Sequence, residues 1–120
     1  RRTRHSLMQP AGTKPLVNFD EIGQKVVTMV HMSLEALVHQ DARMAREIGR
    51  MDEEVDTIHR STYERLKQAM RESPENVEEA VGYLTISRSL ERIADLATNV
   101  AEDIVFMVDG EVIRHQHRGI

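Results

Sequence analysis

The 120-residue sequence contains no cysteine and no tryptophan, and aromatic residues make up only 3% of it. Without cysteine the chain can form no disulfide, perform no thiolate catalysis and offer no sulfur ligand to a soft metal. No apolar run approaches the ~20 residues that a membrane-spanning helix needs. No continuous apolar segment follows Arg1 and Arg2, so the N-terminus does not resemble a signal peptide. These absences are compatible with a cytoplasmic protein, and the missing initiator methionine suggests a fragment or processed product.

An excess of basic residues is also lacking. The formal net charge is −4, whereas nucleic-acid-binding proteins usually present a basic face. The sequence therefore predicts no nucleic-acid partner. It also contains nothing similar to a phosphate-binding glycine-rich loop, a nucleophile elbow or a catalytic triad, and no catalytic residue is predicted.

Helix-breaking residues are concentrated near the N-terminus. Pro10, Gly12 and Pro15 lie in a stretch without apolar periodicity, which predicts a flexible tail or inter-domain linker over residues 1–17. We expect a single helical domain over residues 18–110 and a charged C-terminal tail over residues 111–120.

Three stretches have the apolar period of amphipathic helices. The first begins at Phe19, the second follows Asp41, and the third begins at Ser73-Pro74. The side chains expected to face the core are Phe19, Ile22, Val26, Met29, Ser33 and Leu37 in the first stretch, Met44, Ile48, Met51, Val55, Ile58, Thr62 and Leu66 in the second, and Tyr83, Leu90, Ala94, Ala97, Ala101, Val105 and Val108 in the third. Because the connections are short, the pattern predicts an all-α, antiparallel three-helix bundle.

The helix ends are signalled unequally. Ser73 followed by Pro74 is typical of a helix start, and Gly110 suits the position just after a helix end. Asp41 is a plausible N-cap for the second helix, but the sequence leaves open a continuous helix through Gln40.

Two pairs of carboxylates are the most informative feature. Asp52 and Asp56 are four residues apart, as are Glu91 and Asp95, so each pair shares one helix face. Counted outward from the Ser73-Pro74 turn, the two pairs lie at the same distance and should face each other across an antiparallel hairpin. On a helical wheel, Thr98 and Glu102 lie on the same side as Glu91 and Asp95, beside a stripe of small alanines that permits close helix approach.

Four carboxylates at one level repel one another unless they are neutralised. One solution is a solvated, salt-bridged face in which Arg88 and Arg92 pair with Glu91 and Asp95. The other is a divalent cation that bridges the helices through carboxylate oxygens, the ligands that Mg²⁺ and Mn²⁺ prefer. His59 lies near Asp52 and Asp56, and this spacing resembles half of a di-iron ligand set. Because the second half is missing, we interpret His59 as a peripheral or surface histidine.

The run L-E-R-I-A-D-L-A-T-N-V-A-E-D at residues 90–103, preceded by D-E-E-V-D and K-P-L-V-N-F, resembles the PhoU family of phosphate-transport-system regulators. The resemblance covers residues 14–115. It implies an all-helical fold of two three-helix repeats, each with a pair of E(D)-x-x-x-D motifs that bind metal ions, often as clusters. Carried over to this chain, the metal ligands are Asp52, Asp56, Glu91 and Asp95, with Asn99 and Glu102 as weaker candidates. The metal could be Fe, Zn, Ni, Mn or Mg.

The resemblance also implies a function. Relatives act as non-enzymatic cytoplasmic adaptors that link the phosphate ABC transporter, through its ATPase subunit, to a membrane sensor histidine kinase. They are negative regulators of the phosphate-starvation response and lie at the inner membrane only through these partners. This chain resembles the second repeat alone, so a homodimer could replace the missing repeat. The alternative is a metal-independent helical interaction module whose acidic face docks a basic partner, and a di-metal enzyme is disfavoured because the sequence shows no second histidine motif.

Overall fold

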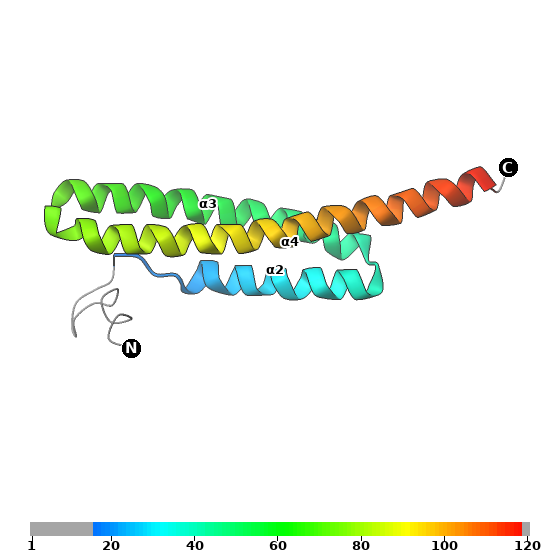
Figure 1. Cartoon of the computed structure of the whole chain (residues 1–120), viewed down its shortest axis with the longest axis horizontal. Helices are drawn as coiled ribbons and strands as arrows, with labels where there is room; N and C mark the ends of the chain where they lie inside the picture. The colour runs from blue at the N-terminus through cyan, green and yellow to red at the C-terminus, as the bar shows by residue number, and fades with distance from the viewer. Residues whose placement is uncertain (1–15, 119–120) are drawn as a thin grey trace.

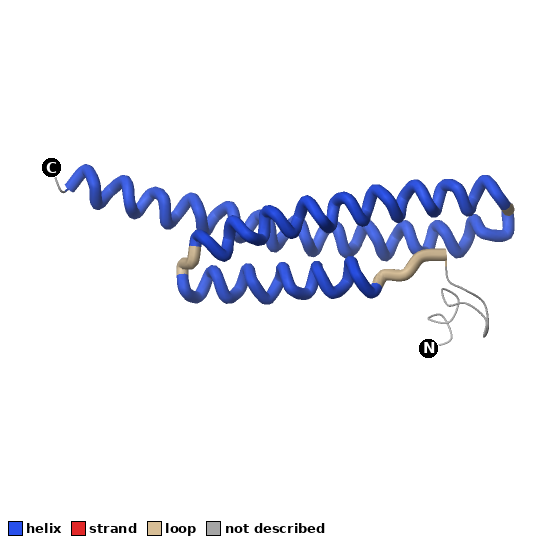
Figure 2. The backbone as a smooth tube through the Cα atoms, turned by 180° about the vertical axis from the view of Figure 1, so that it is seen from behind, coloured by secondary structure: helices blue, strands red, loops and turns tan. Residues whose placement is uncertain are grey.

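The computed structural model describes residues 16–118, and this range contains three α-helices, one 3₁₀ turn and no strand (Figure 1). The elements are α2 (Asp20–His39), α3 (Ala42–Glu72), η1 (Pro74–Asn76) and α4 (Val77–Arg118). Helices α3 and α4 form an antiparallel hairpin, and α2 packs along both, as Figures 1 and 2 show from opposite sides. The predicted all-α three-helix bundle is confirmed. None of the described helices combines the length and apolar character needed to cross a membrane.

The connection between α2 and α3 is a sharp break, which settles the alternative that the sequence left open. Gln40 adopts the left-handed conformation (φ 50°, ψ 48°), and the N–H of Asp41 donates to the carbonyl of Ala36 at 2.9 Å. The Asp41 carboxylate then accepts from the backbone N–H of Met44 at 3.1 Å. Asp41 is therefore the N-cap of α3, and a continuous helix through Gln40 is wrong.

The α3–α4 hairpin turns at Ser73. Its side chain accepts a hydrogen bond from the N–H of Glu75 at 3.2 Å, and Pro74 occupies the first position of the following turn. The side-chain amide of Asn76 donates to the carbonyl of Ala69 at 2.8 Å, which ties the turn to the end of α3. The predicted turn is confirmed, and it fixes how the residues of the two helices pair.

The helix end predicted at Gly110 is wrong. Helix α4 continues through Gly110 to Arg118, so residues 111–118, which were expected to belong to a charged tail outside the helical domain, are helical. Glycine allows a left-handed helix end but does not require one, and here Gly110 keeps a helical conformation. The extra turns extend beyond the end of α2 and α3 (Figure 1).

The core has two parts. The larger part joins all three helices, and its members are Ile22, Val26, Met29, Ala36, Ala45, Ile48, Val55, Ala94, Ala97, Ala101 and Ile104. The smaller part lies near the hairpin turn, where Val17 packs with Leu66, Ala80 and Tyr83, and the rings of Phe19 and Tyr83 are 5.6 Å apart. Residues 16–19 thus cover the stretch of hairpin that α2 does not reach. Of the predicted tail, residues 1–15 lie outside the described residues.

One core position differs from the prediction. Leu37 is 47% exposed, and its neighbour Ala36 is fully buried instead. Ala36 and Ala45 flank the α2–α3 connection, where two helices joined by a tight turn must approach closely. Small side chains fit that space, whereas a leucine would not.

Candidate metal centre

The α3–α4 hairpin brings the two predicted carboxylate pairs to the same level. Asp52 and Asp56 lie on α3, and Glu91 and Asp95 lie on α4. Ala94, Ala97 and Ala101 are buried on the inner side of α4. Their small side chains allow the helix backbones, and hence the acidic residues that flank them, to lie near each other.

Asp52 is the member of the cluster whose surroundings are most unusual. Partial burial raises the pKa of its carboxyl above the ordinary value of 3.8, and the nearby charges of Asp95, Asp56 and Glu91 raise it further. A hydrogen bond from the Thr98 side chain acts in the opposite direction. The other three carboxylates are therefore near enough to act on the charge of Asp52.

Two of the carboxylates have basic partners, although not those expected. Asp56 pairs with Arg60 one turn later, at 2.5 Å, and Glu91 pairs with His59 across the hairpin, at 3.3 Å. The ion pairs found among the described side chains, residues 16–111, do not include Arg88 or Arg92. The fixed positive charge beside the cluster is therefore that of Arg60 on α3, not that of the arginines beside Glu91 and Asp95.

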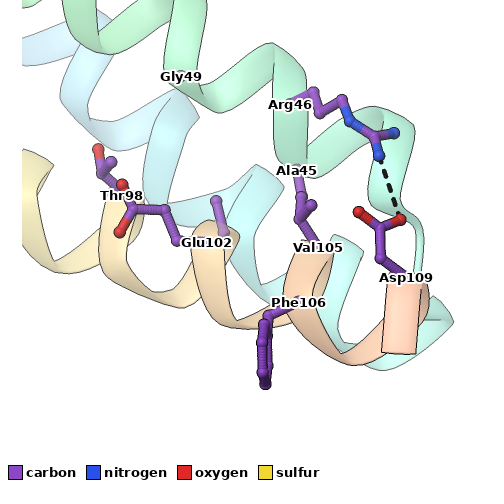
Figure 3. Close-up of a pocket in the computed structure, with 9 residues that line it drawn as sticks. Ala45, Arg46, Gly49, Thr98, Glu102, Val105, Phe106 and Asp109 are labelled. Carbon is purple, nitrogen blue, oxygen red and sulfur yellow. Dashed lines mark hydrogen bonds and ion pairs between the residues drawn. The ribbon is translucent and has the colours of Figure 1, made fainter. Parts of the chain in front are cut away.

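The two weaker candidates are placed differently. Glu102 lies near Thr98 at one end of an apolar groove between the start of α3 and the second half of α4 (Figure 3). The groove has a volume of about 380 Å³, and an ion pair between Arg46 and Asp109 (3.4 Å) bridges its far end. Phe106, at the rim, is 81% exposed. Asn99 is exposed, and none of the contacts described for residues 16–118 joins it to the carboxylates.

The donor types fit a hard divalent cation. Carboxylates from two helices supply oxygen donors, the type that such a cation prefers. Among residues 16–111, whose side chains the structure describes, no three acidic or histidine side chains converge closely enough to form a metal site as they stand. The site residues inferred from the sequence therefore remain a prediction.

The environment of His59 was not predicted from the sequence. Its side chain is only 15% exposed, so it is not a surface histidine. Its Nδ1 lies 2.6 Å from the hydroxyl of Ser87, which is fully buried, and its Nε2 faces Glu91. The signal that could have revealed it is the matching distance of His59 and Ser87 from the Ser73-Pro74 turn.

Comparisons with known proteins give one consistent family. A family model described as the PhoU domain matches residues 19–104. The chain is 33% identical over 111 residues to phosphate-specific transport system accessory protein PhoU homolog 2 of Thermotoga maritima, covering 92% of this chain and 47% of that protein. It is also 33% identical over 99 residues to the PhoU homolog of Pseudomonas aeruginosa, covering 82% of this chain and 41% of that protein. The chain thus spans about half the length of the curated relatives that it matches.

Proposed function

The chain belongs to the PhoU family. From this premise we propose that it is part of an accessory protein that regulates a phosphate-specific transport system. We also propose that the chain binds divalent cations on its α3–α4 face. The proposal includes no enzymatic activity. The observation that carries it is the half-buried Asp52 carboxylate, which shares one level of the hairpin with Asp56, Glu91 and Asp95.

The ligands that we propose are Asp52, Asp56, Glu91 and Asp95, with Asn99 and Glu102 at the edge of the site. A bound Fe, Zn, Ni, Mn or Mg ion would supply the positive charge that this face lacks. The protein contributes the register of the hairpin, which holds carboxylates of both helices at one level. Binding there would stabilise the α3–α4 pairing, because the ion would replace repulsion between the helices with attraction.

The partners are proposed from the relatives, whose names describe accessory proteins of phosphate-specific transport systems. We propose that the complete protein contacts the transporter through its ATPase subunit and a sensor histidine kinase, and that it restrains the kinase when phosphate is plentiful. Both partners would place it in the cytoplasm, at the membrane surface. Exposed apolar side chains on α2, including Val27, Leu34 and Val38, support contacts with another protein or with a second copy of the chain.

The metal half of the proposal is tested by elemental mass spectrometry of chain purified without chelator. We expect stoichiometric metal in the wild type and its loss in the Asp52→Ala/Asp95→Ala variant. The matched control is Glu53→Ala/Asp103→Ala, which removes the same charge from exposed positions of the same two helices. Equal metal content in both variants would contradict the assigned ligands.

The regulatory half is tested by binding of the complete protein to the transporter ATPase subunit and to the kinase, each with and without chelator. Metal-dependent binding is the expected result. A second candidate, the metal-independent module with an acidic docking face, is favoured by the Arg60–Asp56 pair, which neutralises part of the cluster without a cation. It predicts binding that weakens with salt and ignores chelator.

A further inference from the structure

One side of the bundle is formed by the flanks of α2 and α4 that point away from α3. On α2, Lys25 Nζ pairs with Glu54 Oε1 of α3 at 2.9 Å, so the Lys25 flank of α2 faces α3. On α4, Glu91 faces His59 of α3, so the Glu91 flank of α4 faces α3 as well. The opposite flanks of α2 and α4 must then meet on the side that α3 does not cover, since the two helices pack against each other and lie side by side in both views (Figures 1 and 2).

The residues of these two flanks follow from the helical repeat of about 100° per residue. A side chain outside the core lies on the flank away from α3 if it is about 120° or more around its helix from Lys25 on α2, or from Glu91 on α4. Large apolar side chains that are 40–75% exposed occupy both flanks: Val27, Leu34, Leu37 and Val38 on α2, and Ile93 and Leu96 on α4. We call these six residues the α2–α4 face.

The α2–α4 face has the spacing and the size of a helix-packing surface. Its members on α2 recur at steps of three, four and seven residues, and those on α4 are three residues apart, which is typical of helices that pack lengthwise against other helices. Together the six side chains expose roughly 600 Å², the upper end of the ~300–600 Å² patch that a single soluble protein usually leaves open. With a surrounding rim, the face approaches the ~800 Å² that each partner contributes to a stable interface.

The distribution of charge indicates which surface covers the α2–α4 face. None of its members is charged, the half-buried Val30 and Val100 beside it are uncharged too, and charged residues begin only at its edge, with Arg92 and Asp103. A strongly acidic or basic partner would gain no charge attraction from such a face, whereas an identical face would meet it without like-charge repulsion. The side of the bundle that carries the four clustered carboxylates would, in contrast, repel its own copy.

We propose that the α2–α4 face is covered by the same face of a second copy of the chain, so that α2 and α4 of both copies pack around a two-fold axis. The sequence suggested a homodimer without indicating a surface, and the α2–α4 face is the surface that we assign to it. The inference goes beyond the proposed function, because it requires neither a cation nor a subunit of the transporter.

The test measures the molecular mass of the full chain by sedimentation equilibrium in chelator, from micromolar to millimolar concentration. We expect a dimeric wild type, and we expect Leu34→Glu/Leu96→Glu to dimerise about a hundredfold or more weakly, because it brings like charges together in an apolar interface. The matched control is Val81→Glu/Phe106→Glu, which adds the same charge at exposed apolar positions of α4 outside the α2–α4 face and should dimerise like the wild type. All four positions are exposed, and circular dichroism of each variant separates lost association from lost fold.

A second measurement adds no charge to the face. Because the chain has no cysteine, Leu96→Cys carries a single thiol that reports on the α2–α4 face. Its reaction with a maleimide should slow as the chain concentration rises into the range in which the wild type dimerises. The thiol of Val81→Cys, outside the face, should react at the same rate throughout, and equal slowing of both thiols would contradict the assigned surface.

The outcomes distinguish the possible failures. A monomeric wild type over the whole concentration range would overturn the proposal, as would a dimer that persists in Leu34→Glu/Leu96→Glu or is lost equally in the control variant. A dimer that forms only with Mn²⁺ would overturn it too and leave the proposed cation site intact. Failure to bind metal or the transporter subunit would instead contradict the proposed function and leave the α2–α4 interface intact.

Discussion

Replacing Asp52 by asparagine should have opposite effects on stability with and without a cation. In chelator, the wild-type carboxylate is partly buried and lies near the charges of Asp95, Asp56 and Glu91. Asparagine removes the charge, keeps nearly the same volume and retains an oxygen that can accept from Thr98. The metal-free variant should therefore be more stable than the wild type.

The magnitude follows from the number of repulsive pairs. A like-charge pair one helical turn apart, such as Asp52 and Asp56, costs about 0.2–0.5 kcal/mol. Repulsion from Asp95 and Glu91 across the hairpin brings the expected gain to about 0.5–1 kcal/mol. For a domain of this size the melting temperature should rise by about 2–6 °C. With a cation at a hundred times its dissociation constant the wild type should instead gain about 2.7 kcal/mol, which Asp52→Asn would largely lose.

The assay is thermal unfolding followed by circular dichroism, with chelator and then with saturating Mn²⁺, and Glu53→Gln serves as the control at a neighbouring exposed position. The expected result is a reversal of rank: the variant melts higher in chelator and lower with the ion. A variant that melts below the wild type in chelator would refute the electrostatic reasoning. An equal rise with the ion in both proteins would refute Asp52 as a ligand.

Further expectations concern pH, packing and capping. In chelator, the free energy of unfolding of the wild type should fall relative to that of Asp52→Asn as the pH rises from about 4. The reason is that the pKa of Asp52 is raised in the folded state, so folding disfavours its charged form. Parallel stability profiles of the two proteins against pH would contradict this. Leu66→Ala, at a fully buried position, should cost about 2–5 kcal/mol in urea unfolding. Ala97→Leu should destabilise the bundle by about 1–3 kcal/mol through overpacking of the buried inner side of α4, and a neutral result would show that this side is loosely packed. Asp41→Ala should cost about 1 kcal/mol by removing the α3 cap, with Asp41→Ser close to wild type.

The arrangement of the hairpin was predictable from the sequence because its determinants are local. Ser73-Pro74 fixes the turn, and the helical repeat then determines which residues of α3 and α4 lie level with each other. The proximity of Asp52 to Glu91 and Asp95 follows from these two facts. The Asp41 cap could also be predicted, although the sequence did not exclude a continuous helix through Gln40.

Other features depend on contacts that no local pattern expresses. Gly110 remains helical because nothing in α4 forces a left-handed residue there, so its identity alone misleads. The burial of Ala36 in place of Leu37 reflects how closely α2 and α3 approach at their connection. Ser87 lies on the same stripe as Tyr83 and Leu90, so the helical repeat already places it in the core, but no local pattern shows that His59, 28 residues away in the chain, is its partner.

The uninterrupted hairpin restricts how this chain can change length during evolution. One residue inserted in α3 between Asp56 and Ser73 would rotate the first carboxylate pair by about 100° and move it about 1.5 Å along the axis, away from Glu91 and Asp95. A seven-residue insertion is close to two full turns, and if α3 and α4 both received one between the turn and the cluster, the carboxylates would still meet. Deletions rotate and shift the carboxylate pair by the same amounts per residue. Lineages that keep the acidic face can therefore lengthen or shorten this part of the bundle only in paired steps close to a whole number of turns, such as seven or eleven residues.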